Sequence, residues 1–224
     1  MNRYLRWRRE GYLCSTGRCF DIGATVSAAL RRYRRTGNPL AGIADPSAAG
    51  NGCIMRLAPV PIFFFPDEAA AIEHAEASCR ATHGAVECIE ATKLFAAILV
   101  RALAGVPRED LLAKVPGSFQ SERIAAIANG SYVGKPESDV QGSGYVVESL
   151  EAALWSFAET ESFEAAILRA ANLGDDADTT AAVCGQVAGA FYGEPAIPPR
   201  WLERLTMADD IRGLCDRLRS RAQA

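Results

Sequence analysis

The sequence has no long apolar run, and this absence excludes the simplest kind of membrane protein. A helix that spans a bilayer needs about 18 or more consecutive apolar residues, and no segment of the 224-residue chain approaches that length. An apolar core of the kind found in secretory signal peptides is missing as well. We therefore expect a soluble protein that is not inserted in a membrane.

Paired cysteine motifs are also missing. The chain contains seven cysteines, an odd number, and no two of them form a Cys-x-x-Cys motif. Several lie in apolar, helix-like segments, where a free cysteine behaves as a small buried hydrophobic residue. We therefore predict reduced thiols with neither a disulfide nor a zinc site, which indicates a cytoplasmic location.

A large charge of one sign is likewise absent. The chain carries 24 Lys and Arg against 27 Asp and Glu, a formal net charge of −3. Without a large positive excess, no strong attraction to nucleic acid or to an anionic membrane is expected. Arginines are concentrated near the start, as in a mitochondrial presequence, yet Glu10 and the helical pattern around Trp7 favour an exposed helix face.

Strand-like alternation of polar and apolar residues is scarce, whereas helical spacing recurs. The apolar stretch 54–65 contains Pro59 and Pro61, which makes it a poor central strand. We therefore predict an all-α fold that forms a single domain over residues 1–224. Helices are expected at about 1–12, 22–36, 66–82, 85–105, 108–114, 122–128, 145–158, 161–171, 179–192 and 199–219, the last with a break near Thr206.

Acidic residues are crowded at one point near the end of the chain. Asp175, Asp176 and Asp178 directly precede a helix of small residues. Like charges raise one another's pKa, so this crowding costs free energy unless positive charge compensates it. A helix N-terminus compensates part of it, and Mg²⁺ or Mn²⁺, which prefer oxygen ligands, would compensate more. The segment is therefore either a metal site or a helix cap.

The helix after this cluster carries small residues at four-residue steps: Ala181, Gly185, Gly189 and Gly193. Such a stripe lets another helix approach closely, although each glycine lowers the helix propensity. We therefore expect this helix to lie centrally in the bundle and to hold the acidic turn rigidly.

Four further segments have candidate functions and simpler alternatives. The small-residue loop 45–52 could hold a phosphate through its backbone N–H groups, or form an Asn-Gly hairpin turn. His83 lies at a helix boundary, where a structural role is the simpler explanation. Tyr145 follows a flexible Gly-Ser-Gly segment and could stack on a base or sugar, or pack as a half-buried cap. Asp21 precedes a helix and could cap it or serve as a site carboxylate.

The order of these motifs along the chain is more specific than any one of them. They are, in sequence, Trp7-Arg8-Arg9-Glu10-Gly11-Tyr12, Phe20-Asp21-Ile22-Gly23, Gly50-Asn51-Gly52-Cys53-Ile54-Met55-Arg56, Thr82-His83, Gly142-Ser143-Gly144-Tyr145, Gly174-Asp175-Asp176-Ala177-Asp178-Thr179 and Phe191-Tyr192-Gly193-Glu194-Pro195. Together they resemble the ADP-ribosylglycohydrolase family, of the dinitrogenase-reductase-activating and ADP-ribosyl-acceptor hydrolase type. The resemblance covers nearly the whole chain.

The resemblance implies an all-α orthogonal bundle with a two-magnesium or two-manganese centre. The implied reaction releases ADP-ribose from an ADP-ribosylated protein side chain or a small ADP-ribose conjugate. By position, the metal ligands would be Asp176, Asp178 and Thr179, and Asp21 would be the catalytic carboxylate. The implied substrate-binding residues are Gly50, Asn51, Gly52, His83 and Tyr145.

Two motifs of the family have no counterpart in the sequence. Full-length members begin with Gly-Asp-Ala-x-Gly followed by a Glu, and then carry a Thr-Asp-Asp-Thr motif that supplies the other metal ligands. We therefore expect a chain that is incomplete at its N-terminus. It would be a fragment or mis-started frame of an active enzyme, a natural truncation that binds ADP-ribose without hydrolysing it, or one half of a site that a partner completes.

Two other classes of protein share parts of the acidic motif. Asp176-x-Asp178-x-Thr180 also matches haloacid-dehalogenase-like phosphatases, in which the motif follows a buried strand. An EF-hand would need Gly and Glu where the chain has Ala181 and Val187. The leading alternative to a hydrolase is an inactive ADP-ribose-binding module. The acceptor and the oligomeric state are not indicated by the sequence.

Overall fold

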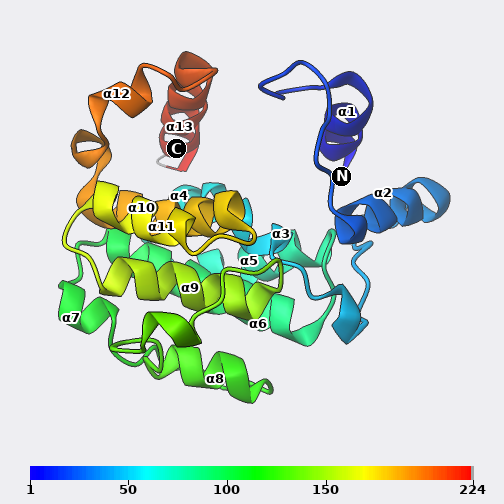
Figure 1. Cartoon of the computed structure of the whole chain (residues 1–224). Helices are drawn as coiled ribbons and strands as arrows, with labels where there is room; N and C mark the ends of the chain where they lie inside the picture. The colour runs from blue at the N-terminus through cyan, green and yellow to red at the C-terminus, as the bar shows by residue number, and fades with distance from the viewer. Residues whose placement is uncertain (223–224) are drawn as a thin grey trace.

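The computed structural model describes residues 1–222 and is built from helices (Figure 1). Within these residues, extended pairing is limited to two isolated bridges, Ile43–His83 and Gly50–Tyr145. The predicted all-α fold is therefore confirmed. The longer helices are α1 (Asn2–Glu10), α2 (Ala24–Thr36), α5 (Glu68–Arg80), α6 (Val86–Leu103), α8 (Glu122–Ala128), α9 (Val146–Ala158), α10 (Phe163–Asn172), α11 (Ala177–Tyr192) and α13 (Ala208–Ala222). Shorter helices are α3 (Gly52–Met55), α4 (Pro59–Phe64), α7 (Arg108–Leu111) and α12 (Pro199–Leu202).

Helix α6 forms the centre of the core. Its residues are apolar on nearly every face, and most of them are buried, including Phe95 and Leu99. A helix that is hydrophobic all round must be enclosed by other elements. Helices α5, α9 and α11 pack around it, so α6 is the element on which the bundle is built.

Helix α11 packs across α9 and α10, as its small-residue stripe predicts. A Cβ atom added at Gly185 would lie 3.4 Å from Ile167 Cδ1, and one at Gly189 would lie 3.9 Å from Phe163 Cε2. Both partners belong to α10, so the stripe is the surface through which α10 and α11 touch. Gly193 lies outside this contact, because it ends the helix with a positive φ of 78°.

Segment 54–65 forms two short helices and no strand. Pro59 is the first residue of α4, a position where the missing N–H of proline costs nothing. The predicted break near Thr206 is present, because α12 ends at Leu202 and α13 begins at Ala208. Four of the cysteines are buried, namely Cys53, Cys79, Cys88 and Cys184.

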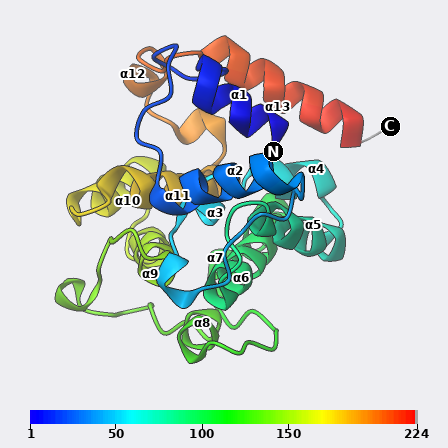
Figure 2. The same ribbon diagram turned by 90° about the vertical axis from the view of Figure 1, so that its right-hand side faces the viewer.

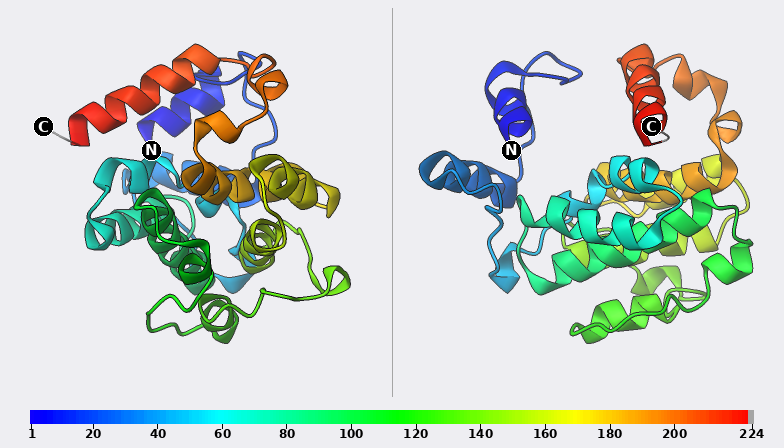
Figure 3. Two further views of the ribbon diagram at one scale, coloured as in Figure 1. Left: turned by 90° about the vertical axis from the view of Figure 1, so that its left-hand side faces the viewer. Right: turned by 180° about the vertical axis from the view of Figure 1, so that it is seen from behind.

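The first and last helices rise from the same side of the bundle. In Figure 1, α1 and α2 stand at one end and α12 and α13 at the other, and the remaining helices form the layer beneath them. The right-hand view of Figure 3 shows the same separation from behind, whereas α1 and α13 overlap in Figure 2 and in the left-hand view of Figure 3. None of the described helices combines the length and apolarity needed to cross a bilayer.

Candidate functional site

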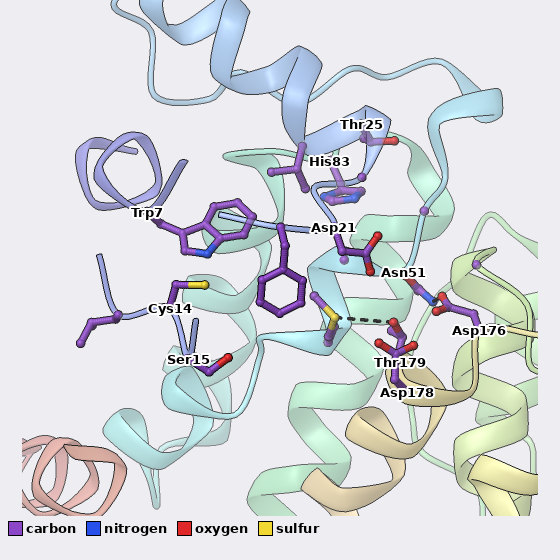
Figure 4. Close-up of a pocket in the computed structure, with 18 of the residues that line it drawn as sticks. Trp7, Cys14, Ser15, Asp21, Thr25, Asn51, His83, Asp176, Asp178 and Thr179 are labelled. Carbon is purple, nitrogen blue, oxygen red and sulfur yellow. Dashed lines mark hydrogen bonds between the residues drawn. The ribbon is translucent and has the colours of Figure 1, made fainter. Parts of the chain in front are cut away.

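A cavity of about 770 Å³ lies between these two pairs of helices, above the start of α11. Its rim is apolar and comes from the chain around Trp7 and Phe20 on one side and Ile211 on the other. Its base is polar. Figure 4 shows the polar residues, which come from four separate segments: Asp21, Asn51, His83, Asp176, Asp178 and Thr179.

The acidic turn is fixed by backbone contacts with the Gly142 segment. The backbone N–H of Asp176 donates a hydrogen bond to the Gly142 carbonyl at 2.9 Å. The hydroxyl of Thr180 donates to the same carbonyl at 3.3 Å. Asp176 precedes the first turn of α11 and Asp178 lies within that turn, where the helix dipole and free N–H groups stabilise negative charge.

Asn51 joins the glycine-rich loop, residues 50–52, to the acidic turn, residues 175–178. Its side-chain amide donates to Asp176 Oδ2 at 2.7 Å and lies 3.3 Å from the hydroxyl of Ser149. Its backbone N–H donates to the Gly144 carbonyl at 3.0 Å. Asn51 is only 8% exposed, so these contacts replace water that it would otherwise bind. Three segments far apart in sequence therefore meet at this one side chain.

His83 lies directly behind the loop, in a chain of hydrogen bonds that holds the imidazole in place. Arg56 Nη2 donates to Thr82 Oγ1 at 2.6 Å, and Thr82 Oγ1 lies 2.8 Å from His83 Nδ1. The threonine oxygen thus connects the guanidinium of Arg56 to the imidazole of His83. Burial lowers the pKa of His83, and the charge of Arg56 acts in the same direction. Burial therefore favours the neutral form of the ring.

The Nε2 atom of His83 faces the glycines of the loop. A Cβ atom added at Gly52 would lie 3.2 Å from His83 Cε1 and 3.5 Å from Nε2, closer than most side chains allow. Glycine at position 52 thus permits the loop to cover the imidazole. The Nε2 edge of the ring therefore lies directly beneath Gly50 and Gly52.

Arg56 holds this region together, and the sequence interpretation assigned it no role. Its guanidinium donates to the carbonyl of Gly52 and, at 3.2 Å, to that of Ser78, while Nε donates to the Tyr4 hydroxyl at 3.1 Å. Arg56 thereby ties α3 to α5 and to α1. Its position in the quoted Gly-Asn-Gly-x-x-Met-Arg motif was the available signal.

Asp21 lines the same cavity from the loop that connects α1 and α2. Its φ of 48° lies in the left-handed region, which is uncommon for a residue other than glycine and is best tolerated by Asn and Asp. Thr179, on the first turn of α11, contacts the sulfur of Met55 at 3.7 Å, the dashed line in Figure 4. Asp21, Asp178 and Thr179 therefore face one space.

Tyr145 lies elsewhere. Its backbone pairs with Gly50, but its ring is not among the side chains that line the cavity. The hydroxyl donates to Glu87, and the guanidinium of Arg123 lies 5.0 Å from the ring centre. Burial, together with the neighbouring Glu87 carboxylate, raises the pKa of Tyr145 to about 12. The structure thus brings together all the predicted site residues except the ring of Tyr145.

The oxygen atoms of the acidic turn fit part of the shell of a hard divalent cation. Two carboxylates and one hydroxyl, from Asp176, Asp178 and Thr179, line the cavity, and Mg²⁺ prefers six oxygen ligands. Asp176 accepts the Asn51 amide through only one carboxylate oxygen. Over residues 1–222, no three acidic, histidine or cysteine side chains converge on one point. A bound ion would therefore need further ligands besides these three.

The phosphatase interpretation lacks its structural context. In that class of enzyme the Asp-x-Asp-x-Thr motif follows a buried strand, whereas Asp176 follows α10, which ends at Asn172. The preceding turn contains Gly174 and Asp175, both with positive φ.

Comparison with known proteins decides the family. The model of the ADP-ribosylglycohydrolase family matches residues 1–224. The chain belongs to the ADP-ribosylglycohydrolase family. The predicted resemblance is thereby confirmed.

Two similar members of this family are ADP-ribosylarginine hydrolases named Tri1. The protein from Pseudomonas putida is 42% identical over 221 residues, which are 99% of this chain and 59% of that protein. The protein from Serratia proteamaculans is 38% identical over 216 residues, which are 96% of this chain and 59% of that protein. This glycohydrolase-family chain therefore spans about three fifths of the length of the curated relatives that it matches.

Two further relatives extend the comparison. The ADP-ribosyl-[dinitrogen reductase] glycohydrolase of Rhodospirillum rubrum is 30% identical over 194 residues, covering 84% of this chain and 60% of that protein. A solved ADP-ribosylglycohydrolase-related protein complex superposes with a TM-score of 0.84 at 39% identity, covering 99% of this chain and 72% of that chain. The helical arrangement of this family member is therefore the family fold.

Proposed function

We propose that this chain forms the ADP-ribose-binding part of a hydrolase that releases ADP-ribose from an ADP-ribosylated arginine on a protein. The observation that carries the proposal is the contact between Asn51 and Asp176, which places the glycine-rich loop against the acidic turn. Asp21, Asp178 and Thr179 line the same cavity. The printed activity of the two Tri1 relatives, 42% and 38% identical, supports arginine as the acceptor.

The cavity offers complementary groups for each part of the substrate. Gly50, Gly52 and the imidazole of His83 line the base of the cavity, where the phosphate or ribose would lie. The apolar rim around Trp7 and Phe20 offers contact area to the base or to the acceptor protein. Cleavage of the glycosidic bond builds positive charge on the ribose, and the carboxylates around the cavity would stabilise that charge.

Asp21 is the proposed general base. A carboxylate beside the ribose can take the proton of the attacking water, and the left-handed backbone of Asp21 brings its side chain to the cavity. Asp176, Asp178 and Thr179 would hold a divalent cation. A bound cation of this kind lowers the pKa of a bound water and orients hydroxyl groups of the substrate. Asn51 keeps the Asp176 carboxylate in a single orientation.

Release of ADP-ribose from an ADP-ribosylated arginine peptide tests the proposal directly. We expect Mg²⁺- or Mn²⁺-dependent release by the wild-type chain, and Asp21→Asn to lower kcat by roughly 100-fold or more, because it removes the base. Asp178→Asn should weaken binding of the cation and of the ADP-ribose that it orients. Arg200→Gln, far from the cavity in an exposed ion pair with Glu164, is the matched control. Unchanged release by Asp21→Asn would contradict the assignment of the base.

A second candidate function is binding of ADP-ribose without hydrolysis. It is favoured by the absence, over residues 1–222, of three acidic, histidine or cysteine side chains that converge on one point. Calorimetric titration separates the two candidates, since a binder retains affinity for ADP-ribose but releases none from the peptide. The buried free cysteines support a cytoplasmic location for either function. An ADP-ribosylated protein is the proposed partner, with neither nucleic acid nor membrane involved.

A further inference from the structure

Gln186 does not line the cavity, but it links α11 to the segment that forms α3 and the start of α4. The residue is seven positions after Thr179 on α11, two helical turns, so it shares the face that carries the acidic turn. Its side-chain amide spans the end of α3 and the start of α4. The oxygen accepts from the Ala58 backbone N–H at 2.8 Å, and the nitrogen donates to the carbonyls of Ile54 and Met55 at 2.9 and 3.1 Å.

These three backbone groups lie at helix ends, where few partners are available within the helix. Ile54 and Met55 are the last residues of α3, and Ala58 directly precedes α4. The Ile54 carbonyl also accepts from the Leu57 backbone N–H at 3.2 Å. A side chain from a different helix therefore replaces the usual helix caps. The result is that α3 is held against α11 at its C-terminal end.

The N-terminal end of α3 begins directly after Asn51. The Asn51 carbonyl accepts from the backbone N–H groups of Ile54 and Met55 at 3.0 and 3.1 Å, so the same two residues that contact Gln186 also define the orientation of Asn51. The Asn51 amide in turn donates to Asp176, at the start of α11. α3 is thus attached to α11 at two points, one of which lies in the cavity.

We propose that Gln186 is a positioning residue, which sets the distance between the Asn51 amide and the Asp176 carboxylate. The proposal rests on the proposed function for its effect on ligand binding, but its geometric content is independent of any ligand. Without the three hydrogen bonds of Gln186, α3 is free to shift along α11, and Asn51 loses its fixed place beside Asp176. Side chains that orient a ligand-binding carboxylate in this indirect way commonly change affinity by about 10- to 100-fold.

Two variants separate this role from a general loss of stability. Gln186→Met keeps the length of the side chain and removes all three hydrogen bonds. Gln186→Glu keeps the acceptor for Ala58 and removes both donors, and it serves if the methionine variant does not fold. Gln120→Met is the matched control, since the side chain of Gln120 is exposed and its amide makes no hydrogen bond in the described structure.

The first measurement needs no ligand. In the wild type, the Asn51 side-chain amide protons should give a resolved NMR signal that exchanges slowly with water, because the amide is bonded to Asp176 and buried. Gln186→Met should shift that signal and speed its exchange by about tenfold or more. The same change in Gln120→Met, or no change in Gln186→Met, would overturn the proposal.

The second measurement is a double-mutant cycle on ADP-ribose binding in the presence of Mg²⁺. Gln186→Met should weaken binding by about tenfold, and Gln186→Met combined with Asn51→Ala should bind no more weakly than Asn51→Ala alone. Additive losses, or a lowered Tm with unchanged affinity, mean that Gln186 only stabilises the fold. If the wild type binds no ADP-ribose, the proposed function fails, and the NMR signal still decides the role of Gln186.

Discussion

At the scale of single residues, the site depends on side chains that fix one another. His83 is 1% exposed and is held by Thr82, whose oxygen accepts from Arg56. Asn51 is similarly fixed by Asp176 and Ser149. Preorganised donors of this kind do not have to reorient when a ligand arrives, which favours tight and selective binding.

The buried His83 predicts a pH dependence of stability. Its pKa is lowered below the ordinary value of 6.5 in the folded state, so the unfolded state binds the proton more readily. The stabilising contribution is complete above pH 6.5 and is lost as the pH falls toward the folded pKa. The loss is about 1.4 kcal/mol for each unit by which folding lowers the pKa.

Chemical denaturation at pH 7.5 and pH 5.5 measures this effect. The wild type should lose more stability over that interval than His83→Gln, which carries no titrating imidazole. Acidic side chains are common to both proteins and cancel in the comparison. Equal losses in the two proteins would show that burial of His83 does not control the pH dependence.

Sequence reasoning at this scale found the residues but not their contacts. The motifs pointed to Asn51, His83 and Asp176 separately, because each lies in a short and unusual string of residues. The hydrogen bond between Asn51 and Asp176 joins residues 125 positions apart, and no local pattern encodes such a pairing. The contact of Tyr145 with Glu87 could not be predicted for the same reason, since Glu87 is 58 positions away.

At the scale of helices, the sequence predicted more. Helix starts agree with side-chain caps: Asp67 accepts from Ala70 at the start of α5, and Ser162 accepts from Ala165 at the start of α10. Helix ends agree with glycines of positive φ, as at Gly11 and Gly37. Caps are local signals and can be identified from neighbouring residues. Segment 54–65 was harder to assign, since its apolar run has no helical period and Pro59 only marks where α4 begins.

The contact between α10 and α11 gives a prediction at the helix scale. Gly185→Ala should raise the free energy of unfolding by about 0.5 to 1 kcal/mol, because alanine has the higher helix propensity. The added Cβ would meet only the terminal methyl of Ile167, at 3.4 Å. Gly185→Leu should instead destabilise the protein by about 1 to 3 kcal/mol, because it overfills the contact.

Urea denaturation of the two variants measures both changes. Gly105→Ala offers a contrast, since Gly105 follows α6 with a φ of 73° and a side chain there is strained despite the open space around it. Destabilisation by Gly185→Ala as large as that by Gly185→Leu would show that α10 and α11 tolerate no added atom.

At the scale of the whole molecule, the cavity is lined by segments from near both ends and from the middle of the chain. Its rim uses residues near Trp7 and near Ile211, and its base uses the middle of the sequence. The order of the motifs was enough to predict the family fold. It could not predict the width of the cavity, because that width depends on how α1, α2 and α13 pack on the bundle. The single domain over residues 1–224 stays a prediction.

Ligand binding should stabilise the whole chain. At about 100 times its Kd, a ligand that binds only the folded state adds about 2.7 kcal/mol. For a protein of this size, each kcal/mol raises the Tm by about 2 to 4 °C, so ADP-ribose with Mg²⁺ should raise it by roughly 5 to 10 °C. Differential scanning fluorimetry measures the shift, with adenosine as the control ligand. EDTA should abolish most of the shift if the acidic turn binds a cation, and an unchanged shift would contradict the metal proposal.

The span of 125 residues between Asn51 and Asp176 also bears on how the protein is made. During synthesis the glycine-rich loop leaves the ribosome long before the acidic turn does. A site that needs both segments cannot assist the early stages of folding of the nascent chain. It forms only after α11 has been synthesised and has packed against α3.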